Sequence, residues 1–212
     1  MSQHIDQISQ PYQGTPVRVL VIPGLNDSGP AHWQTWLASQ FKGARRVVQS
    51  NWDEPDLDMW SAQIDKIMDK SVPGTIWIAA AHSFGCLALA HHLDRRLGGA
   101  PRNGRIGAAL MVAPADPDKF DVVHRLPQSG LGIPLTVIGS ENDPWMPLQR
   151  AQVWAGLWGA RFSNLGAVGH INTESGFGPW PLGRFKVDEL IRNQQKQFRI
   201  DRAHPLELNY AI

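Results

Sequence analysis

The chain has 212 residues, a formal net charge of +1 and one cysteine, which suits one domain and is short for two. Its near-neutral charge, with no basic run longer than two residues, argues against a nucleic-acid partner. One cysteine excludes an internal disulfide and, with no Cys/His cluster, a zinc-finger framework. Because the N-terminus is polar and no apolar run reaches membrane-spanning length, we expect a cytoplasmic protein without a membrane partner.

Short apolar runs alternate with amphipathic segments along most of the chain, which is typical of an α/β fold. We therefore predict a three-layer α/β/α sandwich, in which helices cover both faces of a parallel sheet. No composition shift, repeat or low-complexity segment divides the chain, so we expect a loose leader at 1–16, a single domain at 17–198 and a tail at 199–212. Strands are predicted at 17–22, 46–49, 76–81, 106–113, 134–139 and 161–165, and helices at 33–41, 59–69, 84–97, 149–158 and 182–196.

One connection, 114–133, is long enough to hold extra structure but has no obvious periodicity. Its length suffices for a small flap over a site and not for a cap domain. The way in which it folds determines the volume of any pocket below it, and the sequence pattern leaves this open.

The stretch 75–89, TIWIAAAHSFGCLAL, places Ser83 between a buried strand and a helix. This is the arrangement of the nucleophile elbow of α/β-hydrolases, where a tight turn projects the serine hydroxyl beyond the sheet. The turn requires small residues two positions before and after the serine, and here they are Ala81 and Gly85. Alanine replaces the first glycine of G-x-S-x-G, so an alternative interpretation stays open, in which Ser83 merely caps the helix.

Function in such sheets gathers beyond the carboxyl ends of the strands, where the loops lie side by side. The loop after the fifth strand carries Asp143, and the loop after the sixth carries His170. The chain order Ser83, Asp143, His170 is the order of α/β-hydrolases. Asp116, after the fourth strand, is the rival acid, although its Ala-Asp-Pro-Asp context is typical of a turn.

Each of these residues has a chemical role in this hypothesis. His170 would take the proton of the Ser83 hydroxyl and later protonate the leaving group, while Asp143 orients the imidazole. The backbone N–H groups of Phe84 and Leu25 would form the oxyanion hole.

Substrate contacts are expected from side chains on the same loops, Asn26, Trp52 and Trp145, with Leu25 and Phe84 beside them. Mostly apolar walls would favour an acyl chain or an aromatic ester over a charged peptide. Ordinary packing of these aromatic residues is the alternative interpretation.

Four segments together resemble small bacterial serine hydrolases related to retinoblastoma-binding serine hydrolase: PGLNDSGPAHW, AHSFGC, GSENDPWMP and GHINTESGFG. The resemblance runs from about Val17 to Ile191, and its most specific parts surround Asp143 and His170. It implies a compact α/β-hydrolase with a six-stranded parallel sheet in the order 2-1-3-4-5-6 and no large cap domain. It also implies Ser83, Asp143 and His170 as the catalytic triad. Because natural substrates of the family are poorly defined, the resemblance does not supply one.

Other polar clusters have structural interpretations. The acidic loop 53–58 lacks the glycine and the ligand spacing of a calcium loop, so its charges are expected to be solvated or to begin a helix. His82 should point under the sheet as a hydrogen-bonded structural residue, and the pair His91-His92 suits a helix end. Cys86 is expected to be a small buried residue, although a helix N-terminus can make a thiol reactive. We therefore predict no metal and no organic cofactor.

The sequence thus predicts a serine hydrolase that cleaves small uncharged acyl esters through an acyl-enzyme intermediate, with amide or thioester cleavage left open. Its partner would be a small-molecule acyl substrate, and a homo-oligomer is neither required nor excluded. The alternative is a protein-binding module on a hydrolase scaffold, but the L-x-C-x-E motif recognised by a pocket protein is missing around Cys86.

Overall fold

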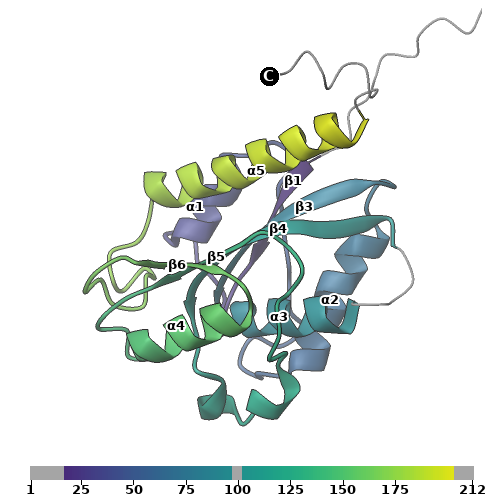
Figure 1. Cartoon of the computed structure of the whole chain (residues 1–212). Helices are drawn as coiled ribbons and strands as arrows, with labels where there is room; N and C mark the ends of the chain where they lie inside the picture. The colour runs from purple at the N-terminus through teal and green to yellow at the C-terminus, as the bar shows by residue number, and fades with distance from the viewer. Residues whose placement is uncertain (1–16, 97–101, 203–212) are drawn as a thin grey trace, which may run out of the picture.

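A six-stranded parallel sheet forms the centre of the computed structural model, which describes residues 17–96 and 102–202 (Figure 1). The strand order is β2-β1-β3-β4-β5-β6, and every neighbouring pair is parallel, which confirms the predicted sheet. The strands are β1 (Val17–Ile22), β2 (Arg45–Arg46), β3 (Thr75–Ser83), β4 (Gly104–Pro114), β5 (Leu135–Gly139) and β6 (Arg161–Asn164).

Helices cover both faces of the sheet, which confirms the predicted three layers (Figure 1). On one face lie α1 (Trp33–Ser39) and α5 (Pro181–Arg202). On the other lie α2 (Leu57–Asp69), α3 (Phe84–Arg96) and α4 (Leu148–Leu157).

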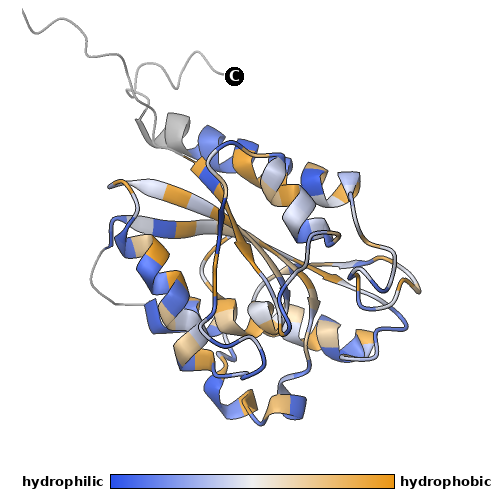
Figure 2. Ribbon diagram, turned by 180° about the vertical axis from the view of Figure 1, so that it is seen from behind, coloured by the Kyte–Doolittle hydropathy of each residue, from blue (hydrophilic) through white to orange (hydrophobic). Residues whose placement is uncertain are grey.

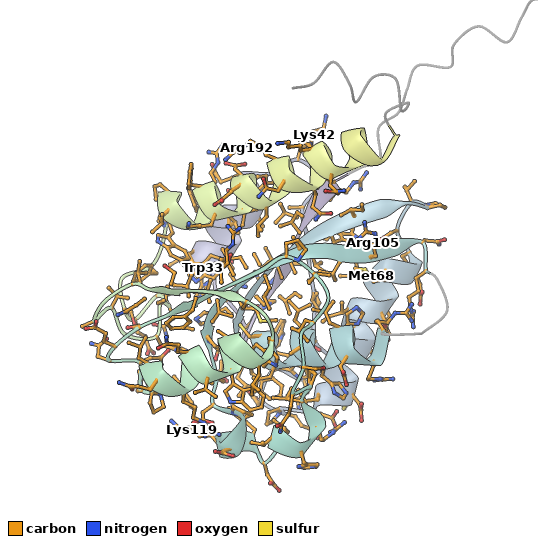
Figure 3. All side chains as sticks on the ribbon, in the orientation of Figure 1. Trp33, Lys42, Met68, Arg105, Lys119 and Arg192 are labelled. Carbon is orange, nitrogen blue, oxygen red and sulfur yellow. The ribbon has the colours of Figure 1, made fainter. Side chains whose placement is uncertain are left out.

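The alternation of side chains along the strands divides the core into two apolar layers. In β1, Val19 and Val21 pack on the α1 and α5 side, whereas Leu20 and Ile22 pack on the side of α2, α3 and α4. Because both faces are covered, the central strands are apolar throughout instead of alternating with polar residues. Figure 2 shows the apolar faces of the helices turned towards the sheet, and Figure 3 labels Trp33 in the layer between α1 and the sheet.

Many predicted boundaries differ from the structure by one or two residues, and two differ by more. Strand β2 lies at the edge of the sheet and ends at Arg46, earlier than predicted. After one further hydrogen bond, from Val47 N–H to the Val21 carbonyl, the chain leaves the sheet. Helix α5 begins at Pro181, a favoured first position, and runs to Arg202, so it includes the first residues of the expected tail. The predicted leader 1–16 and the tail beyond Arg202 lie outside the described residues.

The connection 114–133 forms two short 3₁₀ helices, η1 (Pro117–Phe120) and η2 (Val123–Arg125). Its Phe120 ring lies 5.0 Å from the ring of Phe84, edge-on, so the connection is packed against the body of the domain. Lys119 marks its position beyond α4 in Figure 3. The connection thus forms a small packed flap, a conformation that the sequence pattern leaves open.

None of the helices in 17–96 and 102–202 combines the length and apolar character needed to span a bilayer.

A buried glutamine connects the carboxyl ends of β1 and β3. The Gln34 side chain is fully buried and donates hydrogen bonds to the carbonyl oxygens of Ile22, at 3.0 Å, and Ala80, at 2.8 Å. Its own oxygen accepts a hydrogen bond from the Ser28 hydroxyl at 2.6 Å. One side chain on α1 therefore fixes the ends of β1 and β3 and the loop between β1 and α1.

Replacing this glutamine by an apolar side chain of similar size is expected to destabilise the protein. Gln34→Leu leaves two carbonyl groups and a hydroxyl without this partner in a buried site, which should lower the free energy of unfolding by about 2–4 kcal/mol. Gln152→Leu, at an exposed position of α4, is the control and should change it by less than about 0.5 kcal/mol. Urea denaturation of both variants is the measurement, and equal stabilities would contradict this account of Gln34.

Candidate active site

The turn between β3 and α3 holds Ser83 in a strained conformation. Its φ is 53°, a left-handed value that is uncommon outside glycine. A methyl group on Gly85 would lie 2.6 Å from the Ile22 carbonyl oxygen and closer still to that of Pro23, and one on Gly24 would lie 2.7 Å from the Ser83 Cβ. The loop after β1 therefore passes directly against the turn, and both glycines are required for this approach.

The alanine that departs from the G-x-S-x-G pattern fits without difficulty. Ala81 is fully buried, and its methyl group belongs to the apolar layer on the side of α2, α3 and α4. The substitution thus changes the packing beneath the turn and leaves the position of Ser83 intact.

A continuous chain of hydrogen bonds links three loops that are far apart in sequence. The Ser83 Oγ lies 2.9 Å from His170 Nε2, and His170 Nδ1 lies 2.9 Å from both carboxylate oxygens of Asp143. The side chains of His170 and Asp143 are 8% and 3% exposed, so water competes little for these contacts. The structure therefore brings together the serine, histidine and aspartate that the sequence singles out.

The rival acid, Asp116, has a different role. Its carboxylate accepts a hydrogen bond from Arg150 Nε at 2.7 Å and another from the Asp118 backbone N–H at the start of η1. This side chain ties the flap to α4 and is occupied away from His170.

Two buried side chains fix the backbone of the histidine loop. His82 Nε2 lies 2.9 Å from the carbonyl oxygen of His170, so His82 is the structural residue that the sequence predicts. The indole N–H of Trp33 donates to the carbonyl of Ile171 at 2.9 Å. Ile171 has a φ of 50°, a strained value for a β-branched residue, and these contacts stabilise it.

The loops after β5 and β6 are also tied to each other. The Ser140 hydroxyl accepts a hydrogen bond from Val168 N–H at 3.0 Å, and the Asn142 side chain accepts one from Gly169 N–H at 2.6 Å. The aspartate loop and the histidine loop therefore form one unit. Sequence reasoning missed both Ser140 and Asn142, since short polar loop residues carry no distinctive signal.

The predicted oxyanion donors lie on the two segments that meet at Ser83. Phe84 is the first residue of α3, where backbone N–H groups have no partner within the helix. Leu25 follows Gly24, which touches Ser83, and Leu25 lines the same cavity as Ser83. The next amide, Asn26 N–H, is engaged by the Trp52 carbonyl at 3.1 Å.

A cavity of about 340 Å³ opens over Ser83 and His170, a volume suited to a small ligand. Its walls are mixed, which corrects the expectation of mostly apolar walls. Leu25, Phe120 and Trp145 form the apolar part, and the remaining side chains are mainly polar: Asn26, Asp27, His32, Asn172, Thr173 and Glu174.

The predicted substrate residues divide between the cavity and the core. Asn26 and Trp145 line the cavity. Trp52 is not among the lining residues, because its ring packs edge-on against Trp60, with centroids 5.8 Å apart. The Phe84 side chain is fully buried between Trp60 and Phe120 and does not line the cavity.

Sequence reasoning missed His32, Phe120 and the segment 172–174 as lining residues. The segment lies within the G-H-I-N-T-E motif, which is the signal that could have identified it. His32 likewise lies within the segment PGLNDSGPAHW that carries part of the resemblance. No local pattern marks Phe120, because its position depends on long-range packing.

Acidic and histidine clusters elsewhere are structural. Asp56 caps α2, and Asp58 lies within hydrogen-bond distance of His91, Arg95 and Arg125. No group of three or more potential metal-binding side chains occurs within the part of the chain that the structure describes.

The thiol of Cys86 is fully buried, and this burial raises its pKa far above the ordinary value. The thiolate, which is the reactive form, is therefore strongly disfavoured. Of the two expectations for Cys86, the small buried residue is confirmed.

Two histidines that line the cavity with Ser83 and His170 are held in the neutral form. Burial, with smaller contributions from Arg46 and His170, lowers the pKa of His32 from 6.5 to about 4. Burial also lowers the pKa of His82 well below its ordinary value, and the neighbouring His170 and His32 add to this. The ring centroids of His32 and His82 are 4.9 Å apart, and those of His82 and His170 4.8 Å.

These lowered pKa values make the folded state sensitive to acid. Between pH 6.5 and about 4, the unfolded chain binds a proton at residue 32 that the folded chain does not, so the free energy of unfolding falls as the pH falls. For His32 the slope approaches about 1.4 kcal/mol per pH unit. His32→Asn, which retains a side-chain acceptor before α1, should show a shallower decline in urea denaturation at pH 7.5, 6 and 5. Identical slopes for both proteins would refute this assignment.

Comparisons with known proteins identify the family and the fold of the chain. A model of the family described as serine hydrolase matches residues 19–189. A protein from Pectobacterium atrosepticum described as a YdeN-like hydrolase is 35% identical, with a TM-score of 0.75, over 82% of this chain and 90% of its own. None of the curated proteins compared with the chain matches it.

More distant structures show the same fold. The ydeN gene product of B. subtilis is 19% identical, with a TM-score of 0.67, over 82% of this chain and 98% of its own. Acyl-protein thioesterase 2 of Zea mays is 14% identical, with a TM-score of 0.57, over 88% of this chain and 97% of its own. Since the family model covers most of the chain and the 35% identical hydrolase covers nearly the same part, the chain belongs to the serine hydrolase family and has a compact α/β-hydrolase fold.

Proposed function

We propose that this hydrolase cleaves small uncharged acyl esters through a Ser83–His170–Asp143 triad and an acyl-enzyme intermediate. The observation that carries the proposal is the chain of 2.9 Å contacts from the Asp143 carboxylate through the His170 ring to the Ser83 hydroxyl. Ser83 and His170 both line a cavity that a substrate can enter.

In the acylation step, His170 Nε2 accepts the proton of the Ser83 hydroxyl while Oγ attacks the ester carbonyl carbon. The Asp143 carboxylate accepts a hydrogen bond from Nδ1–H, which keeps Nε2 free as the base and stabilises the imidazolium. His170 then donates the proton to the departing alkoxide oxygen, and the alcohol leaves.

The negative charge of the tetrahedral intermediate falls on the former carbonyl oxygen. The backbone N–H groups of Phe84 and Leu25 would donate hydrogen bonds to it, and loss of one such donor typically lowers turnover by about 10²–10³-fold. Water, deprotonated by His170, then attacks the acyl-enzyme and releases the acid and the free Ser83 hydroxyl.

The cavity supports a small substrate. At about 340 Å³ it lies at the lower end of ligand sites, and its apolar part, formed by Leu25, Phe120 and Trp145, suits a short acyl chain. The carboxylates of Asp27 and Glu174 in its lining disfavour an anionic ligand, which supports an uncharged ester.

Removal of the nucleophile should abolish activity. Ser83→Ala is expected to lower kcat for p-nitrophenyl acetate by at least about 10³-fold and to prevent labelling by a fluorophosphonate. Ser39→Ala, at an exposed position at the end of α1, is the matched control and should behave as the unmodified protein. Full ester turnover by Ser83→Ala would disprove the proposal.

The identity of the acid can be tested by a pair of aspartate variants. Asp143→Asn should lower kcat by about 10⁴-fold, because the amide favours the wrong tautomer of His170. Asp116→Asn removes a charge that contacts Arg150 and should leave kcat within a few-fold of the unmodified value. Steady-state kinetics with thermal unfolding as a check for folding distinguishes the two, and the reverse ranking would assign the acid to Asp116.

A further inference from the structure

His32 is a buried histidine in the wall of the active-site cavity that the proposed mechanism does not use. It is 4% exposed, precedes α1 and lines the cavity together with Ser83 and His170. Its ring packs edge-on against that of His82, at 4.9 Å between centroids. A polar side chain so deeply buried beside the reacting atoms calls for a physical explanation.

The hydrogen bonding of His32 defines which ring nitrogen carries the proton. The Gln34 backbone N–H donates to Nδ1 at 3.1 Å, so Nδ1 holds a lone pair and the neutral ring carries its proton on Nε2. The lowered pKa of about 4 keeps the ring neutral at physiological pH. Within residues 17–96 and 102–202, no side chain or carbonyl accepts a hydrogen bond from Nε2. Nε2–H is therefore a donor available to a molecule in the cavity.

Capping of α1 does not explain the choice of histidine. The contact to Gln34 N–H needs only a short side-chain acceptor, and Ser, Thr, Asp and Asn supply one with less buried area. Burial of the imidazole is unfavourable for its charged form, as the lowered pKa of His32 records. The distal nitrogen, which plays no part in the cap, is the atom that distinguishes histidine from these residues.

The surroundings of His32 indicate what it would bind. Asn26, Asp27, Asn172, Thr173 and Glu174 contribute the polar part of the cavity with it. Two of the cavity's three apolar lining residues, Phe120 and Trp145, lie on the segments after β4 and β5, and the third, Leu25, precedes Asn26. Asp27 is already paired with Arg46. Because the cavity lining already carries the carboxylates of Asp27 and Glu174, the neutral N–H donor of His32 suits the hydroxyl oxygen of a ligand better than a ligand carboxylate.

We propose that His32 is a specificity-determining residue, whose Nε2–H donates a hydrogen bond to a hydroxyl group on the alcohol part of the ester. The apolar part of the cavity then holds the acyl chain, and the substrate class is a short acyl ester of a polyol. This inference rests on the proposed ester hydrolysis.

Two esters of nearly equal size test the contact. 2-Hydroxyethyl butyrate and propyl butyrate differ by a hydroxyl in place of a methyl group, and acid release in a pH-stat reports the turnover of both. We expect the protein to favour the hydroxyethyl ester in kcat/KM by about threefold to tenfold, the range of one net hydrogen bond. The preference should appear mainly in KM, because the contact is present before the transition state.

Two variants separate the nitrogens of the ring. Asn at position 32 reproduces the acceptor that Nδ1 provides and lacks a donor at Nε2, whereas Gln places its amide N–H₂ near the position of Nε2. We expect His32→Asn to lose the preference and His32→Gln to retain at least half of it. The readout is the ratio of kcat/KM for the two esters. A loss of activity that affects both esters equally therefore leaves it unchanged.

Each result bears on a distinct claim. Absence of a preference in the unmodified protein, or its persistence in His32→Asn, would overturn the role of His32, as would an equal loss in both variants. Ser83 labelling by a fluorophosphonate without turnover of either ester would refute the polyol ester class while the nucleophile stands. Failure of labelling and of p-nitrophenyl acetate turnover would instead refute the proposed hydrolysis.

Discussion

The close approach of two backbone segments underlies the whole site. The loop after β1 passes against the turn between β3 and α3 so tightly that neither Gly24 nor Gly85 leaves room for a methyl group. This contact holds Ser83 in its strained conformation and brings Leu25 beside it. Gln34 stabilises the same junction, because its side chain donates hydrogen bonds to carbonyl oxygens at the ends of β1 and β3. The proposed nucleophile and its oxyanion donors therefore depend on a single junction between neighbouring parallel strands.

Much of the fold and the central part of the site could be predicted from the sequence, because both depend on local patterns. The apolar run 76–81 identifies a strand buried on both faces, and the small residues around Ser83 identify the turn that follows it. Parallel strands bring their carboxyl ends to one edge, so Asp143 and His170 could be placed near Ser83 from their positions directly after the fifth and sixth strands. The resemblance of the motifs around these residues supplied the strand order.

The details that the sequence did not reveal depend on packing between distant segments. Trp52 occupies a loop of the right kind, but its ring packs against Trp60 and away from the cavity. His32 lies in the cavity because α1 docks against the ends of β1 and β3, and the segment PGLNDSGPAHW that contains it does not by itself predict that docking. The φ angle of Ile171 has a strained, left-handed value. His82 and Trp33 stabilise it by hydrogen bonds to the carbonyl groups of His170 and Ile171.

The residues of the proposed triad differ in how deeply their elements are embedded in the sheet. Ser83 ends the central strand β3, which has neighbours on both sides, whereas His170 follows β6, a four-residue strand at the edge of the sheet. Edge elements open more readily than central ones. Fraying of β6 would displace the imidazole while the serine turn stays folded. On gentle heating, catalytic competence would thus disappear before the global structure melts, and would return on cooling without refolding of the core.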